Sequence, residues 1–268
     1  MEMILANATV IRLGCFAGIL LIMAIWEILA PRRVLTQRKA TRWVNNLGLT
    51  LGNTFLARVV FPVAAVGVAL LATEKGWGVL NQLTLPGWLA GLLAIAGLDL
   101  AIYLQHRLFH RVALLWRLHR MHHSDLDYDV TTGARFHPLE ILLSQLIKMG
   151  VVLLLGAPAG AVVAFEVILN GTAMFNHGNV CLDLRIDRWL RLLLVTPDMH
   201  RVHHSVVHRE TDSNFGFNFP WWDRLFGTYR DQPEAGHLAM SIGLANYRDP
   251  KWLKINWMLL TPFIRADR

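Results

Sequence analysis

Two short stretches of the sequence repeat one arrangement of histidines. Residues 119–124 read HRMHHS and residues 200–205 read HRVHHS, so each has histidines at positions i, i+3 and i+4. A third stretch, residues 106–110, reads HRLFH and has histidines at i and i+4. On an α-helix these positions lie on one face. Each stretch is therefore predicted to direct its imidazole rings the same way.

Imidazoles in this number favour a metal site, because neutral imidazole is a good ligand for iron, zinc, copper and nickel. A catalytic zinc ion usually takes about three protein ligands and a structural one about four. The clustered histidines therefore predict two metal ions with about four ligands each and open positions for water or oxygen. The eight histidines are His106, His110, His119, His122, His123, His200, His203 and His204.

The spacing also constrains the helices that carry these residues. On one straight helix, His106 and His119 would lie about 20 Å apart and on different faces. The chain must therefore turn between His110 and His119 if both belong to one centre. Residues 196–198 read Thr-Pro-Asp, which is typical of a helix N-terminus. A helix starting there would carry the last three histidines.

Two residues outside the motifs are candidates for the same centre. Asp99 is seven residues before His106, on the same helical stripe, and could accept a hydrogen bond from a ligand histidine. Alternatively, a neighbouring helix satisfies it as a buried polar residue. His177 follows an apolar region at the depth expected for the motifs, and we expect it to be a ninth ligand; the alternative is a hydrogen-bonded histidine at the membrane interface.

Three more residues are expected to support ligands rather than to bind metal. His137 precedes Pro138, which resembles the first residue of a helix, so a capping or supporting role is predicted. Asn176 is next to His177 and is likewise predicted to support a ligand rather than to bind metal. His208 lies one turn beyond the last motif, where it would either extend the histidine face or point to solvent.

The composition indicates a membrane protein. Hydrophobic residues make up 54% of the chain and charged residues only 17%, and the mean hydropathy is +0.38, a balance typical of chains that lie in lipid. The two cysteines, Cys15 and Cys181, give neither a disulfide framework nor a Cys-x-x-Cys metal site. The net charge of +7 gathers at the ends of apolar runs, which favours membrane orientation over nucleic-acid binding.

Five apolar segments predict the membrane helices, at about residues 13–30, 49–72, 85–104, 138–156 and 160–175. The last two flank the sequence GAPAG and would form a helical hairpin. Residues 31–42 contain five Lys or Arg and no acid, which predicts a cytoplasmic loop. The N-terminus would then lie outside, and the histidine-bearing residues 105–137 and 176–268 would lie inside.

The predicted fold is all-α: an integral membrane bundle of three spanning helices plus the helical hairpin, with a cytoplasmic histidine-rich helical cap. Residues 1–268 are expected to form a single membrane-embedded domain, because no linker or second soluble domain is visible. The membrane would be a bacterial inner membrane, or the endoplasmic reticulum if the source is eukaryotic.

The motifs and their surroundings resemble the fatty acid hydroxylase / sterol desaturase superfamily of membrane di-iron oxygenases. The resemblance covers about residues 98–229 and implies that this is the catalytic region. It further implies that the eight clustered histidines and His177 bind two iron ions, with no catalytic residue beyond these ligands. Ala173 stands where some fatty acid hydroxylases have another histidine, which argues against a tenth ligand and against transferring their substrate. The similar stretches are DLAIYLQHRLFH (99–110), LWRLHRMHHSD (115–125), RFHPLE (135–140), PDMHRVHHS (197–205) and NFGFNFPWWDRLFGTY (214–229).

The resemblance also implies the reaction, in which O2 and two electrons hydroxylate or desaturate a C–H bond of a lipid-soluble substrate such as a sterol or fatty acyl chain. The sequence has no flavin or nicotinamide fingerprint, so electrons would come from a separate ferredoxin or cytochrome b5-like donor with its reductase. Basic residues near the motifs could dock such a donor or simply be solvated. They are Arg107, Arg117, Arg120 and Arg201.

Other classes of function stay open. A metal transporter would place ligands in mid-membrane, whereas these lie at helix ends. A zinc hydrolase would need a general base, and the sequence contains no His-Glu-x-x-His, although zinc could occupy the cage in purified protein. The substrate is not predicted, because the membrane segments that would select it are uniformly apolar. Nearby aromatic residues could wall the site or anchor it in the membrane interface; they are Trp221, Trp222, Phe226 and Tyr229.

Overall fold

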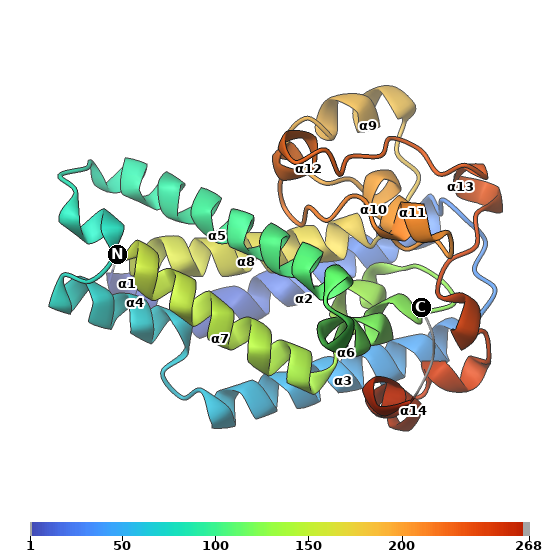
Figure 1. The fold of residues 1–268 in the computed structure, drawn as a ribbon, viewed down its shortest axis with the longest axis horizontal. Helices are drawn as coiled ribbons and strands as arrows, with labels where there is room; N and C mark the ends of the chain where they lie inside the picture. Colours follow the sequence, from blue (N-terminus) through green and yellow to red (C-terminus); the bar gives the residue numbers. More distant parts are fainter. Residues whose placement is uncertain (1, 265–268) are drawn as a thin grey trace.

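The structure is a computed structural model that describes residues 2–264. No β-strand occurs in that range, and the all-α bundle predicted from the sequence is confirmed. Figure 1 shows long helices running side by side along the longest axis, with most of the short helices gathered at one end. The long helices are α2 (Ala8–Leu29), α3 (Lys39–Val60), α5 (Gly87–Arg111), α7 (Pro138–Leu155) and α8 (Ala159–Asn176).

The short elements divide between the two ends of the bundle. Those at the N-terminal end are α1 (Glu2–Ala6), α4 (Ala64–Lys75) and η1 (Val79–Gln82). Those around the opposite end are α6 (Ala113–His123), η2 (Val130–Ala134), α9 (Leu184–Leu190), α10 (Pro197–His203), α11 (His208–Thr211), α12 (Trp221–Leu225), α13 (Gly236–Ala239), η3 (Ala245–Tyr247), η4 (Pro250–Leu253), α14 (Ile255–Leu260) and η5 (Thr261–Phe263). We call this second group, with its connecting loops, the cap.

The bundle presents an apolar surface. Five segments are long and apolar enough to cross a membrane, and in α2 only 11% of the most apolar window is buried inside the protein. Large side chains such as Ile22, Phe55 and Leu154 are 62%, 72% and 71% exposed. Such an apolar surface is suited to contact with lipid. A helix of about 20 apolar residues is long enough to span the hydrocarbon core of a membrane.

The second apolar segment differs from its prediction. A single crossing over residues 49–72 is expected from hydropathy, but α3 begins ten residues earlier, at Lys39, and ends at Val60. Pro62 follows at once, and proline removes a backbone donor and clashes with the preceding turn of a helix. The chain restarts as α4 at Ala64, whose φ of 50° marks the sharp turn. Helix α4 then packs against α7 and α8.

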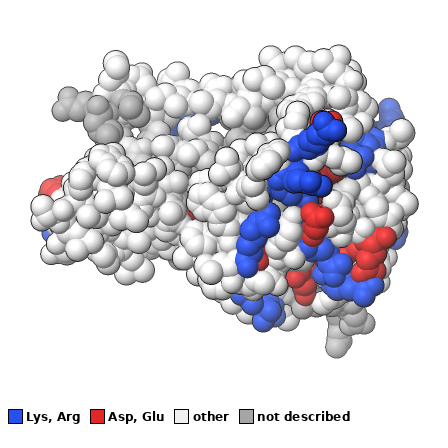
Figure 2. Space-filling view, turned by 90° about the horizontal axis from the view of Figure 1, so that it is seen from above, with Lys and Arg blue, Asp and Glu red and all other residues white. Residues whose placement is uncertain are grey.

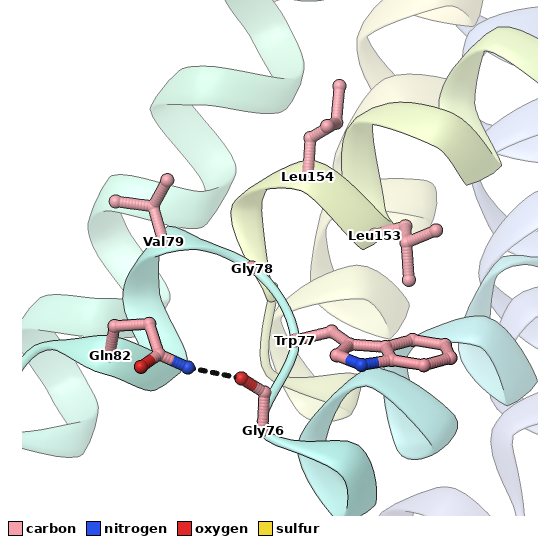
Figure 3. Close-up of a pocket in the computed structure, with 7 residues that line it drawn as sticks. All are labelled: Gly76, Trp77, Gly78, Val79, Gln82, Leu153 and Leu154. Carbon is pink, nitrogen blue, oxygen red and sulfur yellow. Dashed lines mark hydrogen bonds between the residues drawn. The ribbon is translucent and has the colours of Figure 1, made fainter.

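The predicted hairpin is present. Helix α7 ends at Leu155, and Gly156 adopts a left-handed φ of 66° before Pro158 caps α8. The turn lies against Gly78, where an added Cβ would approach the Gly156 nitrogen to 2.1 Å. Only glycines allow this contact, which joins the hairpin to the loop after α4 (Figure 3). A shallow apolar pocket lies beside the same contact, lined by Gly76, Trp77, Gly78, Val79, Gln82, Leu153 and Leu154.

Candidate metal centre

Nine histidines converge where the cap meets the bundle. Each is at most 4% exposed, and they form two groups within which one nitrogen of every ring lies within 4.8 Å of the others. The structure thus brings together all nine residues that the sequence predicts as ligands. The five-histidine group is His106, His110, His119, His123 and His203, and the four-histidine group is His122, His177, His200 and His204.

The elements that supply these rings meet at one end of the bundle. Helix α5 ends at Arg111 and α6 begins at Ala113, so the turn predicted between His110 and His119 is confirmed. The fold places α6 and α10 beside the end of α8, whose C-cap is His177 (Figure 1). Helix α10 begins as predicted after Thr196, whose side chain accepts the backbone N–H of Met199.

Each His-x-x-His-His motif is divided between the two groups, so the expectation that each motif directs all its rings one way is wrong. In α6, His119 and His123 belong to the five-histidine group and His122 to the other. In α10 the assignment is reversed, since the five-histidine group takes only His203. Successive residues on a helix are rotated by about 100°, which is enough to aim the last two histidines of a motif at different centres.

The outer nitrogens of five rings are held by oxygen acceptors. Because carbonyl and carboxylate oxygens accept hydrogen bonds, each of these Nδ1 atoms carries the hydrogen and each Nε2 keeps a free lone pair. The pairs are His106 with the Phe215 carbonyl (2.8 Å), His177 with the Ala173 carbonyl (2.7 Å), His203 with the Ser213 carbonyl (2.8 Å), His119 with Glu140 Oε1 (2.6 Å) and His110 with Asp212 Oδ1 (3.2 Å).

One pair of inner nitrogens has no hydrogen to share. His106 Nε2 lies 3.1 Å from His119 Nε2, although both rings already carry their hydrogen on Nδ1. Two lone pairs repel at this distance unless a cation lies between them, which is the arrangement of two imidazoles on one metal. His203 Nε2 and both nitrogens of His204 have no hydrogen-bond partner among the described residues. The donor set therefore fits a metal ion in each group.

Burial keeps the rings in the form that binds metal. Outside the membrane segments, burial lowers the pKa of His122, His123, His200 and His204 well below the ordinary value. It lowers the pKa of His177 and His203 to about 3. Neutral imidazole is the ligand form, so these rings need no deprotonation at neutral pH.

Acidification is expected to destabilise the metal-free protein. Since the pKa of His177 and His203 is about 3 in the fold and about 6.5 in an unfolded chain, only the unfolded chain gains protons between these values. Each residue then costs about 2 kcal/mol of folding free energy at about pH 5. Thermal unfolding of metal-free protein in detergent should shift to lower temperature between about pH 7.5 and pH 5. An unchanged midpoint would contradict the burial of neutral rings.

Glu140 is a site residue that the sequence motifs do not single out. It lies in the first turn of α7, is 3% exposed, and accepts the Nδ1 hydrogen of His119. Its other oxygen has no hydrogen-bond partner among the described residues. The carboxylate thus fixes the orientation of His119 and raises its basicity as a ligand. The RFHPLE stretch carries this residue, but nothing in its spacing pairs it with a histidine 21 positions earlier.

Replacing Glu140 with leucine is expected to weaken metal binding by about 10–100-fold, because His119 loses the acceptor that orients it. The substitution Glu140→Gln keeps an acceptor oxygen and should have a smaller effect. Iron affinity of the purified protein, measured by competition with a chelator, checks both. Leucine at the exposed Glu234 is the control, and equal affinities for all three variants would refute the assignment.

The loop after α11 closes the centre through its backbone. Its carbonyls at Ser213 and Phe215 hold His203 and His106. Asp223 fixes this loop by accepting the N–H groups of Phe215 and Gly216, both at 2.8 Å. Burial raises the pKa of Asp223 to about 6.

The first two residues predicted to support the ligands, Asp99 and Asn176, both contact the segment of residues 217–222. Asp99 accepts the Trp222 indole N–H at 2.8 Å, and its other oxygen has no hydrogen-bond partner within the described chain. The described residues show no hydrogen bond from a ligand histidine to Asp99; Trp222 of α12 satisfies it instead, in agreement with the alternative of a buried polar residue bonded to a neighbouring helix. Asn176 donates to the Phe217 carbonyl at 2.9 Å, which holds this segment against α8.

The other two supporting candidates lie outside the histidine groups. His137 is the N-cap of α7, with Nδ1 accepting the Leu139 N–H, in agreement with the predicted capping role. The His208 side chain is 67% exposed, and its Nε2 lies 3.6 Å from Asp212 Oδ2. Since Asp212 also contacts His110, His208 lies two contacts from the five-histidine group.

Two of the four arginines proposed for donor docking cannot take that role. Arg120 is 3% exposed and donates to the Thr261 and Ile264 carbonyls, while Arg201 is fully buried and pairs with Asp198. Both instead hold segments of the cap together.

Glu27 is another site-building residue whose partners could not be predicted. It is the acid near the end of the first apolar segment, and it is 5% exposed. Its Oε1 accepts the N–H groups of Val130 and Asn179 at 2.7 and 2.9 Å. These residues follow α6 and α8, so one carboxylate joins the two histidine-bearing segments to α2.

Comparison with known proteins places these features in a family. The sequence profile of the family described as Fatty acid hydroxylase matches residues 91–228, the part that contains all nine histidines. The chain is 31% identical over 256 residues to the ornithine lipid hydroxylase OlsE of Rhizobium tropici. It is 32% identical over 142 residues to the alkylglycerol monooxygenase of Homo sapiens. No solved structure shows a significant match.

The extent of these matches differs. The similarity to OlsE covers 92% of this chain and 74% of that protein. The similarity to alkylglycerol monooxygenase covers 53% of this chain but 31% of the human protein. A very-long-chain aldehyde decarbonylase of Oryza sativa subsp. indica, GL1-5, is 28% identical over 54% of this chain and 25% of its own length.

Proposed function

This chain belongs to the fatty acid hydroxylase family, and on that premise we propose that it is a di-iron enzyme that hydroxylates a membrane lipid with O2. The observation that carries the proposal is the two groups of buried histidines whose nitrogens lie within 4.8 Å of one another, some with no hydrogen to share and others with no hydrogen-bond partner among the described residues. Hydroxylation is favoured over desaturation because two relatives are named as a lipid hydroxylase and a monooxygenase.

The five-histidine group would hold one iron and the four-histidine group the other. When bound, the two ions would supply the redox chemistry that O2 activation requires. The chain itself orients the imidazole rings and keeps water away from the metal centre. The oxygen acceptors described above hold five of the nine imidazoles in one tautomer, and Phe136 stacks on His122 with ring centroids 4.5 Å apart. Phe215 and Phe217 cover His106 with centroids at 5.6 and 5.7 Å, which excludes water from the centre.

The protein is an integral membrane protein, and we propose that its cap faces the cytoplasm. Figure 2 shows that charged side chains gather at one end of the molecule, while most of the remaining surface in view is uncharged. The basic loop of residues 31–38 joins α2 to α3 at the end where the cap lies (Figure 1). Loops rich in Lys and Arg stay on the cytoplasmic side, so the N-terminus would lie outside, in a bacterial inner membrane or, in a eukaryote, the endoplasmic reticulum.

Exposed aromatic residues are consistent with a cap that touches the membrane interface. Trp189 is 71% exposed, Trp221 43% and Phe226 41%, and all three lie in or beside α9 and α12. Such rings favour the headgroup region. A lipid could then reach the histidines from the bilayer without crossing water.

We propose a separate electron donor, because the described chain is all-helical and its motifs include no dinucleotide fold. A ferredoxin or a cytochrome b5-like protein with its reductase would dock on the cap. Arg117 remains a candidate contact, as an exposed residue of α6.

The test uses isotopic oxygen. Membranes that contain the protein, iron and a reductase system would be exposed to 18O2, and the lipid extract would be compared with that of membranes lacking the protein. We expect one lipid class to gain a single 18O atom. Label that enters only from 18O-water would indicate hydrolysis instead, and an unlabelled, unchanged lipid profile would refute the proposal.

A further inference from the structure

Three charged side chains meet inside the membrane bundle, away from the histidines. Lys148 Nζ of α7 lies 2.7 Å from Glu166 Oε1 of α8, and Arg12 Nη1 of α2 lies 3.0 Å from Glu166 Oε2. Charged residues in membrane spans are costly and commonly mark functional sites. Glu166 precedes His177 by eleven residues, a distance of about 16 Å along the helix. We call Arg12, Lys148 and Glu166 the membrane triad.

The membrane triad has one positive charge that no negative charge within the triad neutralises. It contains two cations and one carboxylate, and a buried charge without a counter-charge is strongly destabilising. The side chains of Arg12 and Lys148 are 31% and 14% exposed, whereas that of Glu166 is 8% exposed. Arg12 Nε is buried and has no hydrogen-bond partner among the described residues. The cations are therefore reachable from the bilayer and can accept a further anion.

The surroundings favour an anion that arrives on a lipid. The triad lies between three apolar helices, where a free hydrated ion would lose its solvation. Figure 2 shows a furrow along the uncharged part of the molecule, with the colour of Lys and Arg visible inside it. A lipid brings its charge attached to a hydrocarbon chain, and that chain matches the apolar helix surfaces around the triad.

We propose that the membrane triad binds the anionic group, a carboxylate or a phosphate, of the lipid that is oxidised. The inference rests on the proposed function and adds the class of substrate: a lipid with a negative charge, bound so that its hydrocarbon chain extends toward the histidines. Glu166 and His177 are separated by about 16 Å along α8. The C–H bond at the metal centre would therefore lie well along the hydrocarbon chain of the lipid, far from its charged group.

A charge series separates this role from a structural ion pair. The substitution Lys148→Gln leaves Arg12 and Glu166 as a neutral pair, Glu166→Gln raises the surplus to two charges, and the double variant restores a surplus of one. The control is Lys75→Gln, an exposed residue at the end of α4 paired with Glu74. Thermal unfolding of each variant in detergent shows which are folded.

Binding of phosphatidylglycerol, phosphatidylcholine, oleate and inorganic phosphate to the purified full-length protein is then measured. We expect Lys148→Gln to weaken binding of phosphatidylglycerol and oleate about fivefold, Glu166→Gln not to weaken it, and the double variant to recover wild-type binding. Phosphatidylcholine should bind weakly to all variants. A purely structural role would instead appear as a loss of stability and lipid binding in Glu166→Gln, which leaves both cations without their counter-charge.

Two outcomes would overturn the inference: equal binding of phosphatidylcholine and phosphatidylglycerol by the wild type, or binding of inorganic phosphate as tight as that of lipid. Because these measurements need no turnover, they are independent of the oxygenase assay. Lost lipid selectivity with intact hydroxylation would remove only the substrate assignment. Intact selectivity without hydroxylation would remove only the proposed reaction.

Discussion

Alanine in place of His203 or His200 is expected to abolish lipid hydroxylation. His203 belongs to the five-histidine group and His200 to the four-histidine group. If both groups hold iron for one reaction, either loss stops turnover, because neither ion can replace the other. The two variants should differ in metal content. His200→Ala leaves its group with one ligand fewer than a four-coordinate site requires, while His203→Ala leaves four histidines in place.

The iron bound per purified protein and the labelled lipid product are both measured for each variant. The matched control is His208→Ala, which lies on the same segment but has a side chain that is 67% exposed and outside both groups. We expect it to keep full iron content and product formation. Full hydroxylation by His200→Ala would show that the four-histidine group is dispensable and would disprove the two-metal proposal.

Methionine in place of Arg42 is expected to cost about 3–5 kcal/mol of stability, the loss typical of breaking a buried ion pair. The guanidinium binds Asp125 through Nε at 2.8 Å and Nη2 at 2.9 Å, and it also pairs with Asp129. All three side chains are fully buried. Without the arginine, two carboxylates would remain in the protein interior with too little positive charge.

This cluster matters to the centre because Asp125 directly follows the HRMHHS motif of residues 119–124. Although burial alone raises the pKa of Asp125, Arg42 and Arg135 lower it below the usual value, so the carboxylate stays charged and holds the end of α6 to α3. A lower unfolding temperature and lower iron content are expected together in Arg42→Met. Recovery of stability when Asp125→Asn and Asp129→Asn are added would confirm the cause.

The exposed Arg38, four residues earlier, is the control for Arg42. Its replacement with methionine should leave the unfolding temperature within experimental error of the wild type, because surface charges contribute little. If Arg42→Met unfolds at the same temperature as Arg38→Met, the buried cluster is not what stabilises the junction between α3 and α6.

The sequence predicts the histidines of the centre better than it predicts the groups that hydrogen-bond to them. Eight of the nine histidines stand in repeated local motifs that carry their own signal, whereas His177 stands alone and is predicted from its place after an apolar segment and from the family resemblance. Glu140 holds His119 across 21 positions, and the Phe215 carbonyl holds His106 across 109. Such partners depend on how helices pack, and a carbonyl leaves no mark in the residue type. No local pattern could have identified them.

The same limit applies to the membrane segments. Hydropathy finds them because lipid selects only for apolar residues, but it continues unchanged across Pro62, where the helix stops. Hydropathy also registers Arg12, Lys148 and Glu166 only as single charged residues in three apolar segments. That they contact one another follows from the packing of three helices, which hydropathy does not report.

Three of the five acceptors that orient the histidine rings are main-chain oxygens, at Ala173, Ser213 and Phe215. A side-chain substitution at these positions that preserves the backbone path leaves the acceptor in place. The acceptor role of these three positions therefore depends on the backbone path and not on the type of side chain. Substitution of Ser213 by alanine should therefore leave the orientation of His203 unchanged, in contrast to the loss expected when the side-chain acceptor Glu140 is replaced.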